Sequence, residues 1–174
     1  CIRDRKYPQS ELSAQAGFER AIIRYRRGDT TSAIELFREV KRIFPETDWG
    51  DQSIYRIAMH YRANGQYDSA RYYFSIISDI KENPKISSEA RYRIGELYLR
   101  DKDYEKAIEN FLIVKNNYEG YEDWYSLALL NLGEAYEKTN NNDLARDIYN
   151  TLHILRPDDD FGKTAKSRLR RMKR

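Results

Sequence analysis

Apolar and polar positions along the chain follow a helical period, and the whole pattern recurs about every 37 residues. Its clearest marker is an alanine in an apolar stretch, followed four residues later by an aromatic residue. Four copies of this marker occur, with the pairs Ala33 and Phe37, Ala70 and Phe74, Ala107 and Phe111, and Ala145 and Tyr149. Recurrence at this length is typical of arrays in which one small structural unit is repeated.

Each copy predicts a pair of helices joined by a tight turn. Polar breakers interrupt the apolar pattern within every copy, in RRGDT, ANGQ, RDKD and TNNND. Twelve residues before each marker alanine stands a small residue, namely Ala21, Ala58, Gly95 and Gly133. A small residue lets two helix backbones approach closely, and the aromatic residue of the same copy fills the space beside it. One pair cannot bury its apolar face alone, so neighbouring pairs must stack.

The pattern therefore predicts an all-α fold, a right-handed α-solenoid of four helix pairs with a capping helix at its C-terminal end. We expect a single array over residues 1–174, in which residues 1–10 are the tail of a preceding unit or an N-terminal lead. The predicted units that follow are repeat 1 (11–50), repeat 2 (51–86), repeat 3 (87–122), repeat 4 (123–158) and the capping helix (159–174).

The predicted capping helix has one apolar face, formed by Phe161, Ala165, Leu169 and Met172. We expect this face to cover the last repeat while the charged residues of the helix face water. The three aspartates 158–160 stand near its N-terminus, where the helix dipole favours negative charge. A calcium site is not expected, because a single acidic triplet lacks the spaced ligands of a calcium loop.

Charge is unevenly distributed along the chain. The net charge is +3, yet residues 163–174 include seven basic residues and no acidic one, so the rest of the chain is net acidic. Such a segment could bind nucleic acid or anionic lipid by charge. It shares a helix with an apolar stripe, however, and we interpret it as the solvated side of the cap. We therefore expect no nucleic-acid partner.

Residues that carry catalysis or bind metals do not converge in this sequence. The two histidines, His60 and His153, fall in different predicted repeats, and the single cysteine is Cys1. Neither histidine has a cysteine or a second histidine at metal-ligand spacing. There is no glycine-rich phosphate loop and no nucleophile motif. We therefore expect no enzyme activity, no metal and no cofactor.

The repeated pattern resembles the tetratricopeptide repeat family from about Glu11 to Arg156. Copies three and four match best, in GELYLRDKDYEKAIENF and GEAYEKTNNNDLARDIY. The resemblance implies an interaction scaffold that binds a peptide or a partner protein in a groove lined by the first helix of each pair. By the family pattern, the groove residues are Tyr25, Tyr55, Arg56, Met59, Arg62, Tyr92, Arg93, Glu96 and Arg100.

Two interpretations of the predicted groove stay open. Aromatic and arginine side chains suit a binding surface because they stack on a partner and form charge-assisted hydrogen bonds. The alternative is that Phe18, Tyr55 and Leu130 pack between adjacent repeats. The oligomeric state and the identity of the partner do not follow from the sequence.

Two stretches, YPQSELSAQAGF and FPETDWGDQSIYRIA, are similar to units of bacterial cell-envelope proteins of the BamD and YbgF/CpoB type. This resemblance implies a scaffold in the periplasm, free or anchored to the outer membrane, with a cytoplasmic location as the alternative. The other interpretation is that the array is a regulatory or structural segment of a larger protein, such as an enzyme with its catalytic domain elsewhere.

Cys1 is a candidate lipidation site, because bacterial lipoproteins carry their anchor on a cysteine at the first mature position. The repeat register favours a different interpretation. A shift of one period lays Tyr7-Pro8 over Phe44-Pro45, and it lays Cys1 over Arg38, inside a predicted helix. We therefore expect a cut through a longer array, with the lipid anchor as the alternative.

Overall fold

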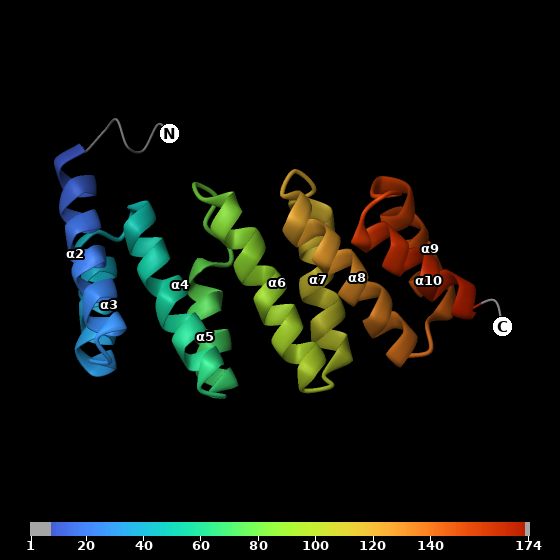
Figure 1. The fold of residues 1–174 in the computed structure, drawn as a ribbon, viewed down its shortest axis with the longest axis horizontal. Coiled ribbons are helices and arrows are strands. Elements are labelled where there is room, and N and C mark those ends of the chain that lie inside the picture. The colour runs from blue at the N-terminus through green and yellow to red at the C-terminus, as the bar shows by residue number, and fades with distance from the viewer. Residues whose placement is uncertain (1–7, 173–174) are drawn as a thin grey trace. The chain divides into compact units, whose positions relative to one another are not determined.

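The computed structural model describes residues 8–172, and every regular element within them is an α-helix (Figure 1). Along the chain the helices are α2 (Pro8–Arg26), α3 (Thr30–Ile43), α4 (Asp48–Ala63), α5 (Tyr67–Ile77), α6 (Pro84–Arg100), α7 (Tyr104–Asn117), α8 (Glu122–Lys138), α9 (Asn142–Leu155) and α10 (Asp160–Met172). They form four successive pairs and a final helix, so the predicted helical repeat architecture is confirmed.

The helices group into two compact units, which divide between Ile86 and Ser87. Unit 1 contains α2 to α5, and unit 2 contains most of α6 together with α7 to α10. Some helices begin before the expected repeat boundaries, and α4 starts at Asp48 because the Thr47 hydroxyl caps it, accepting a bond from the Gly50 N–H at 3.1 Å.

One type of turn joins the two helices of every pair. The second residue after each first helix has a positive φ, and these residues are Gly28 (84°), Gly65 (72°), Lys102 (63°) and Asn140 (59°). In each turn the following backbone N–H donates to the carbonyl oxygen five residues earlier, as from Asp29 to Arg24 at 3.1 Å. This is the Schellman motif, which satisfies carbonyl groups left free at a helix end. The four polar breakers in the sequence are therefore four copies of one helix stop.

In unit 2, the small residue of each first helix lies against the aromatic residue of its second helix. A Cβ added at Gly95 would lie 2.6 Å from Cε1 of Phe111, and one added at Gly133 would overlap the ring of Tyr149. Both rings are fully buried. The predicted crossing is therefore confirmed for these pairs, since the ring occupies the space that any larger side chain would need.

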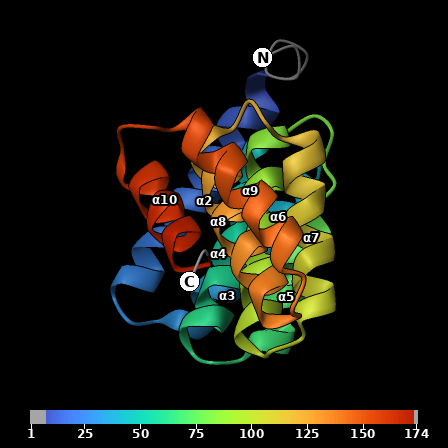
Figure 2. The same ribbon diagram turned by 90° about the vertical axis from the view of Figure 1, so that its right-hand side faces the viewer.

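Helix α10 covers the last repeat, beside α9 (Figure 2). Ala165 is fully buried, and Phe161, Leu169 and Met172 are partly buried against the core of unit 2. The predicted apolar face of this helix is therefore confirmed, and it closes the repeat that α8 and α9 form.

Asp159 starts α10. Its carboxylate accepts hydrogen bonds from the backbone N–H groups of Phe161 at 2.9 Å and Gly162 at 3.1 Å. Desolvation alone would raise the pKa of Asp159, but the N–H of Gly162 and the guanidinium of Arg156 lower it below its usual value. Asp159 thus caps the N-terminus of α10, the helix end where the sequence places three aspartates.

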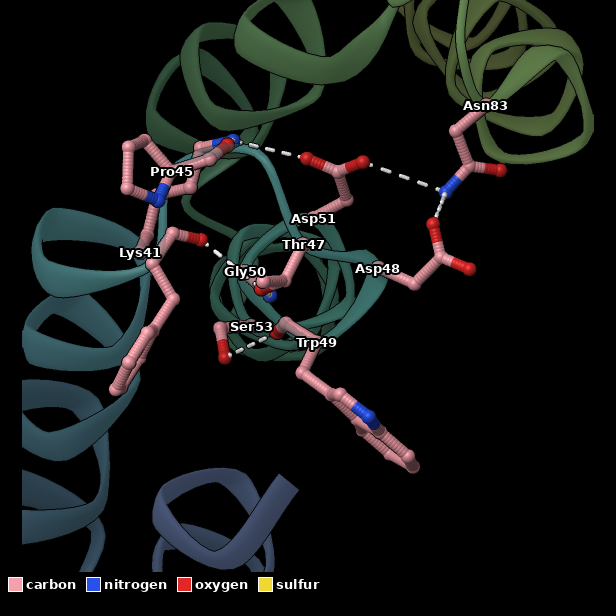
Figure 3. A network of polar contacts seen from close by, with 10 residues as sticks. Lys41, Pro45, Thr47, Asp48, Trp49, Gly50, Asp51, Ser53 and Asn83 are labelled. Atoms are coloured by element: carbon pink, nitrogen blue, oxygen red, sulfur yellow. Dashed lines mark hydrogen bonds and ion pairs between the residues drawn. The ribbon is translucent and has the colours of Figure 1, made fainter. Parts of the chain in front are cut away.

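A buried polar cluster in unit 1 links the end of α3, the start of α4 and the segment after α5 (Figure 3). Asp51 is fully buried, and its Oδ1 lies 2.8 Å from Nζ of Lys41, which also donates to the carbonyl oxygen of Pro45 at 2.6 Å. On the other side, Nδ2 of Asn83 donates to Asp51 and to Asp48, each at 3.3 Å. This cluster fixes the loops at one end of the helices of unit 1.

Candidate interaction surface

In unit 1 several predicted groove residues lie on one face of α2 and α4. Tyr25 is 39% exposed, and its hydroxyl lies 3.2 Å from Nδ1 of His60, with the two rings edge to face. Arg56 is exposed one helical turn before His60, on the same side of α4. Met59 and Arg62 are half-buried. We call Tyr25, Arg56, Met59 and His60 the first-helix face of unit 1, whereas Arg62, two residues after His60, lies on another side of α4.

Two other aromatic residues of these helices point into the interior. Phe18 is buried, with its ring 5.4 Å from that of Phe37 and 5.1 Å from that of Trp49. Tyr55 is half-buried, and its ring lies 5.9 Å from that of Phe74. The ring of Phe18 therefore packs between the first and second helix pairs, whereas that of Tyr55 packs within the second pair.

In unit 2, Tyr92 belongs to the core. It is 4% exposed, and its ring lies 6.0 Å from that of Phe111 and 5.5 Å from that of Trp124. Its hydroxyl accepts a hydrogen bond from Nδ2 of Asn131 at 3.2 Å. We expected Tyr92 to line the groove. A ring enclosed in this way cannot contact a partner, and Tyr92 is therefore not one of the binding residues.

The charged groove residues of α6 are differently placed. The guanidinium of Arg93 lies 5.4 Å from the ring centre of Tyr92 and 5.0 Å from that of Trp124, and it is 3.2 Å from the carboxylate of Glu96. The Arg93 side chain is only 17% exposed, whereas that of Arg100 is 52% exposed. Arg93 and Glu96 thus pair with each other on the surface of unit 2. Arg100 is more accessible to a partner than Arg93 is.

A polar contact also joins α8, α9 and α10 in unit 2. The hydroxyl of Tyr149 donates to Glu137 at 2.5 Å, and the guanidinium of Arg168 lies 3.4 Å from Glu134 and 3.5 Å from Glu137. Burial, and then the bond to Glu137, raise the pKa of Tyr149 far above its usual value. Arg168, from the basic segment, therefore pairs with acidic residues of the last repeat.

A second aromatic and basic cluster, on α3, α4 and α5, was not predicted. The rings of Tyr61 and Tyr73 stack 5.3 Å apart at an angle of 7°, and Arg38 donates to both hydroxyls, at 3.3 Å and 2.9 Å. The bond to Tyr73 raises the pKa of Arg38 against the effect of its partial burial. Tyr72, beside this cluster, is 63% exposed. The sequence could not predict this cluster, because its residues come from three helices and no single spacing along the chain connects them.

Within residues 8–172, no group of three histidine, cysteine or acidic residues is placed to hold a metal ion. None of the helices in that range is long and apolar enough to cross a membrane. Cys1, the candidate lipidation site, lies outside the described residues.

Comparison with protein families and solved structures agrees with this architecture. Family models for the tetratricopeptide repeat match residues 15–47 and residues 87–153, which together are more than half of the chain. A comparison with curated protein sequences gives no match.

Two solved structures illustrate the similarity of fold. The crystal structure of MamA has 18% identity and a TM-score of 0.60, over 87% of this chain and 86% of MamA. PilF of Pseudomonas aeruginosa has 14% identity and a TM-score of 0.63, over 93% of this chain and 71% of that one. The tetratricopeptide repeat is generally a non-catalytic module that binds protein or peptide partners. The four helix pairs, their shared turn and the matches to both units show that this chain belongs to the tetratricopeptide repeat family.

Proposed function

We propose that this protein is a non-catalytic scaffold that binds a peptide or a partner protein on the first-helix face of unit 1. The face offers an exposed guanidinium at Arg56, a partly exposed ring at Tyr25 and the flexible side chain of Met59. Tyrosine and arginine contribute most to the energy of protein interfaces, and methionine adapts to partners of different shape.

The observation that supports this proposal best is the contact between Tyr25 and His60. It joins two successive first helices and fixes the orientation of the Tyr25 ring before any partner arrives. A preorganised ring loses little conformational entropy on binding. With Arg56 one turn away, the face suits an extended segment that pairs an apolar side chain with a carboxylate.

We also propose that this scaffold works in the bacterial cell envelope, in the periplasm or anchored to the outer membrane. This proposal is supported by the similarity of YPQSELSAQAGF and FPETDWGDQSIYRIA to units of envelope proteins. Fractionation of cells that produce the natural protein tests it, and recovery with the cytoplasmic fraction would contradict it.

Site-specific photo-cross-linking tests the binding face. A photoreactive amino acid replaces Arg56 in one variant and Tyr72 of α5 in another. Each variant is produced in place of the natural protein in its native cells, and the cells are then irradiated. Both positions are exposed, but only Arg56 lies on the first-helix face. We expect one discrete protein adduct at position 56 that is absent at position 72.

A second variant checks the role of the side chains. Tyr25→Ala combined with Arg56→Ala should reduce recovery of the cross-linked partner about tenfold or more, as expected when interface tyrosine and arginine residues are truncated. The melting temperature should change little, because both residues are exposed. Adducts that form only at position 72 would place binding on another face.

A further inference from the structure

The two units of this protein differ where their second helices meet. In unit 1 the contact between α3 and α5 is made by Arg38, which donates to the hydroxyls of Tyr61 and Tyr73. We call these three residues the Arg38 cluster. At the equivalent positions, two repeats further along the chain, unit 2 has Leu112, Tyr136 and Ile148. Ile148 belongs to the buried core there, and the other two pack against that core. The repeat architecture therefore does not require a guanidinium at this place.

The Arg38 cluster has hydrogen-bond donors left over. Nη2 of Arg38 lies 3.3 Å from the hydroxyl oxygen of Tyr61 and 2.9 Å from that of Tyr73, so both hydrogens of this nitrogen are engaged. The hydrogens on Nη1 and Nε are not engaged, and each hydroxyl that accepts in this way keeps its own hydrogen. Among the residues that the structure describes, no acceptor receives any of these hydrogens. The cluster therefore offers several donors to a ligand.

The charge of Arg38 is not balanced by a carboxylate. Glu39, the next residue of α3, lies 3.8 Å from Arg20 and is its partner. Glu35 stands one turn before Arg38, but within residues 8–172 the two form no ion pair. One turn after Arg38, Arg42 is exposed and adds a second guanidinium on the same side of α3. The surface around the Arg38 cluster thus has an excess of positive charge, which favours an anion.

The accessibility of Arg38 can be compared with that of its equivalents in other second helices. Helix α5 has α3 before it in the array, and α9 has α7 before it. At the positions equivalent to Arg38, Ser75 of α5 and Asn150 of α9 are nevertheless exposed, as Arg38 is. The positions equivalent to Arg42 are exposed in both helices as well. A preceding second helix leaves this side open, so the accessibility of the cluster does not depend on what precedes α2.

The arrangement of the donors favours a phosphate group over a carboxylate. A carboxylate is planar and binds best to two parallel N–H groups of one guanidinium. Both such pairs in an arginine include Nη2, and the Nη2 hydrogens of Arg38 are already engaged. The donors that remain belong to three separate side chains. The oxygens of a phosphate point in tetrahedral directions and can accept from separate groups, and a phosphate group also carries more negative charge than a carboxylate.

We propose that the Arg38 cluster is a binding site for a phosphate group, either the free ion or the phosphate of a small organic ester. Arg38 and the hydroxyls of Tyr61 and Tyr73 donate to its oxygens, and Arg42 adds positive charge from one turn away. The two phenol rings are stacked at 7° and hold the guanidinium in place, so it loses little conformational freedom on binding. The site shares no residue with the first-helix face and does not depend on the function proposed above.

Nuclear magnetic resonance on the full chain tests the site. The Nε–H signals of the arginines are followed in isotope-labelled protein, and the variant Arg38→Lys identifies the signal of Arg38 by its loss. Sodium phosphate, glycerol phosphate and sodium acetate are added in separate titrations, with sodium chloride keeping the ionic strength constant. We expect phosphate to shift the Arg38 signal to saturation, with a dissociation constant at least about fivefold lower than that of acetate.

Two matched tyrosine variants locate the binding. Tyr73→Phe keeps the ring and removes one donor, and it should weaken phosphate binding about fivefold. The control is Tyr72→Phe at the preceding residue, which is 63% exposed and has no hydrogen bond to Arg38 in the described part of the chain. This control should bind phosphate as the natural chain does. Arg42→Gln should weaken binding about twofold at low salt and less at high salt, because it removes only a nearby charge.

The outcomes separate this proposal from its alternatives. An Arg38 signal that shifts without saturation, or equal binding of phosphate and acetate, would overturn it. A Tyr73→Phe variant that binds phosphate as tightly as the natural chain would overturn it as well. Glycerol phosphate that binds at least as tightly as free phosphate supports an organic ester as the ligand, and weaker binding supports the free ion. Circular dichroism of each variant checks that the helices are intact.

Discussion

Single residues decide how each helix pair is closed. The turns of unit 1 use Gly28 and Gly65 at the position with positive φ, whereas those of unit 2 use Lys102 and Asn140. Glycine adopts this conformation without steric cost, but a side chain with a Cβ is strained there. The turn geometry is nevertheless the same in all four copies, because the hydrogen bonds of the Schellman motif hold it.

Lys102→Gly should therefore stabilise unit 2. We expect the free energy of unfolding to rise by about 1 kcal/mol, since the strain of the left-handed conformation is removed. Urea denaturation followed by circular dichroism measures the change. Gly28→Ala is the inverse control and should lose a similar amount, and a loss of stability in Lys102→Gly would show that its side chain stabilises the turn.

Gly95→Ala should destabilise unit 2, although alanine favours helices. The added Cβ would lie 2.6 Å from Phe111, whose ring is fully buried and cannot move aside. Overpacking of this kind costs about 1–3 kcal/mol, which exceeds the gain of about 1 kcal/mol in helix propensity. Gly120→Ala is the control, because a Cβ there has no atom within 4 Å. Equal stability of the two variants would contradict the contact.

Between elements, the sequence predicts some contacts and not others. The helix pairs, their turns and the apolar face of α10 follow from short spacings in one segment, which a helical period translates directly into a face. The cluster of Lys41, Asp51 and Asn83 could not be predicted, because its members come from three segments and look like ordinary surface residues. Tyr92 was misjudged because a ring at the border of an apolar stripe can turn inward or outward with the same spacing.

Lys41→Met should strongly destabilise unit 1. It leaves the fully buried carboxylate of Asp51 without its ammonium partner. Removing one partner of a buried ion pair costs about 3–5 kcal/mol. Denaturant unfolding measures the loss. Lys81→Met, at an exposed position, should change little, and a similar loss in both variants would argue against a special role for the buried pair.

The buried contact between Tyr149 of α9 and Glu137 of α8 should make the stability of the protein depend on pH in the alkaline range. The pKa of Tyr149 is raised above 10.0, chiefly by burial, so the folded state favours the neutral phenol. The stabilisation is fully present below pH 10 and is lost as the pH rises above it, because the unfolded chain ionises first. Melting temperatures between pH 8 and 11 should fall less steeply in Tyr149→Phe than in the natural chain. The control Tyr72→Phe, at a 63% exposed residue, should keep the natural slope.

At the scale of the whole molecule, the described helices belong to two compact units rather than to one undivided core. The repeat count predicts four pairs, but a regular period carries no information about where an array is divided. In arrays of this kind the free energy of unfolding is approximately the sum of the stabilities of single repeats and of the contacts between neighbouring repeats. The effect of a destabilising substitution therefore tends to stay local.

Hydrogen exchange measured by mass spectrometry should show this locality. Gly95→Ala should speed amide exchange in peptides from residues 87–172 and leave those from residues 8–86 nearly unchanged, and Lys41→Met should have the opposite effect. Local opening is expected where contacts are broken nearby. Uniformly faster exchange along the chain in either variant would show that the two units unfold together.

The position of the division after Ile86 also bears on how the protein is made. A ribosome adds about 5–20 residues per second, and domains fold N-terminal first during synthesis. Helical structures with local contacts fold within about a millisecond. The first half of the chain can therefore fold while the second half is still being translated, and no native contact within unit 1 has to wait for a residue beyond it.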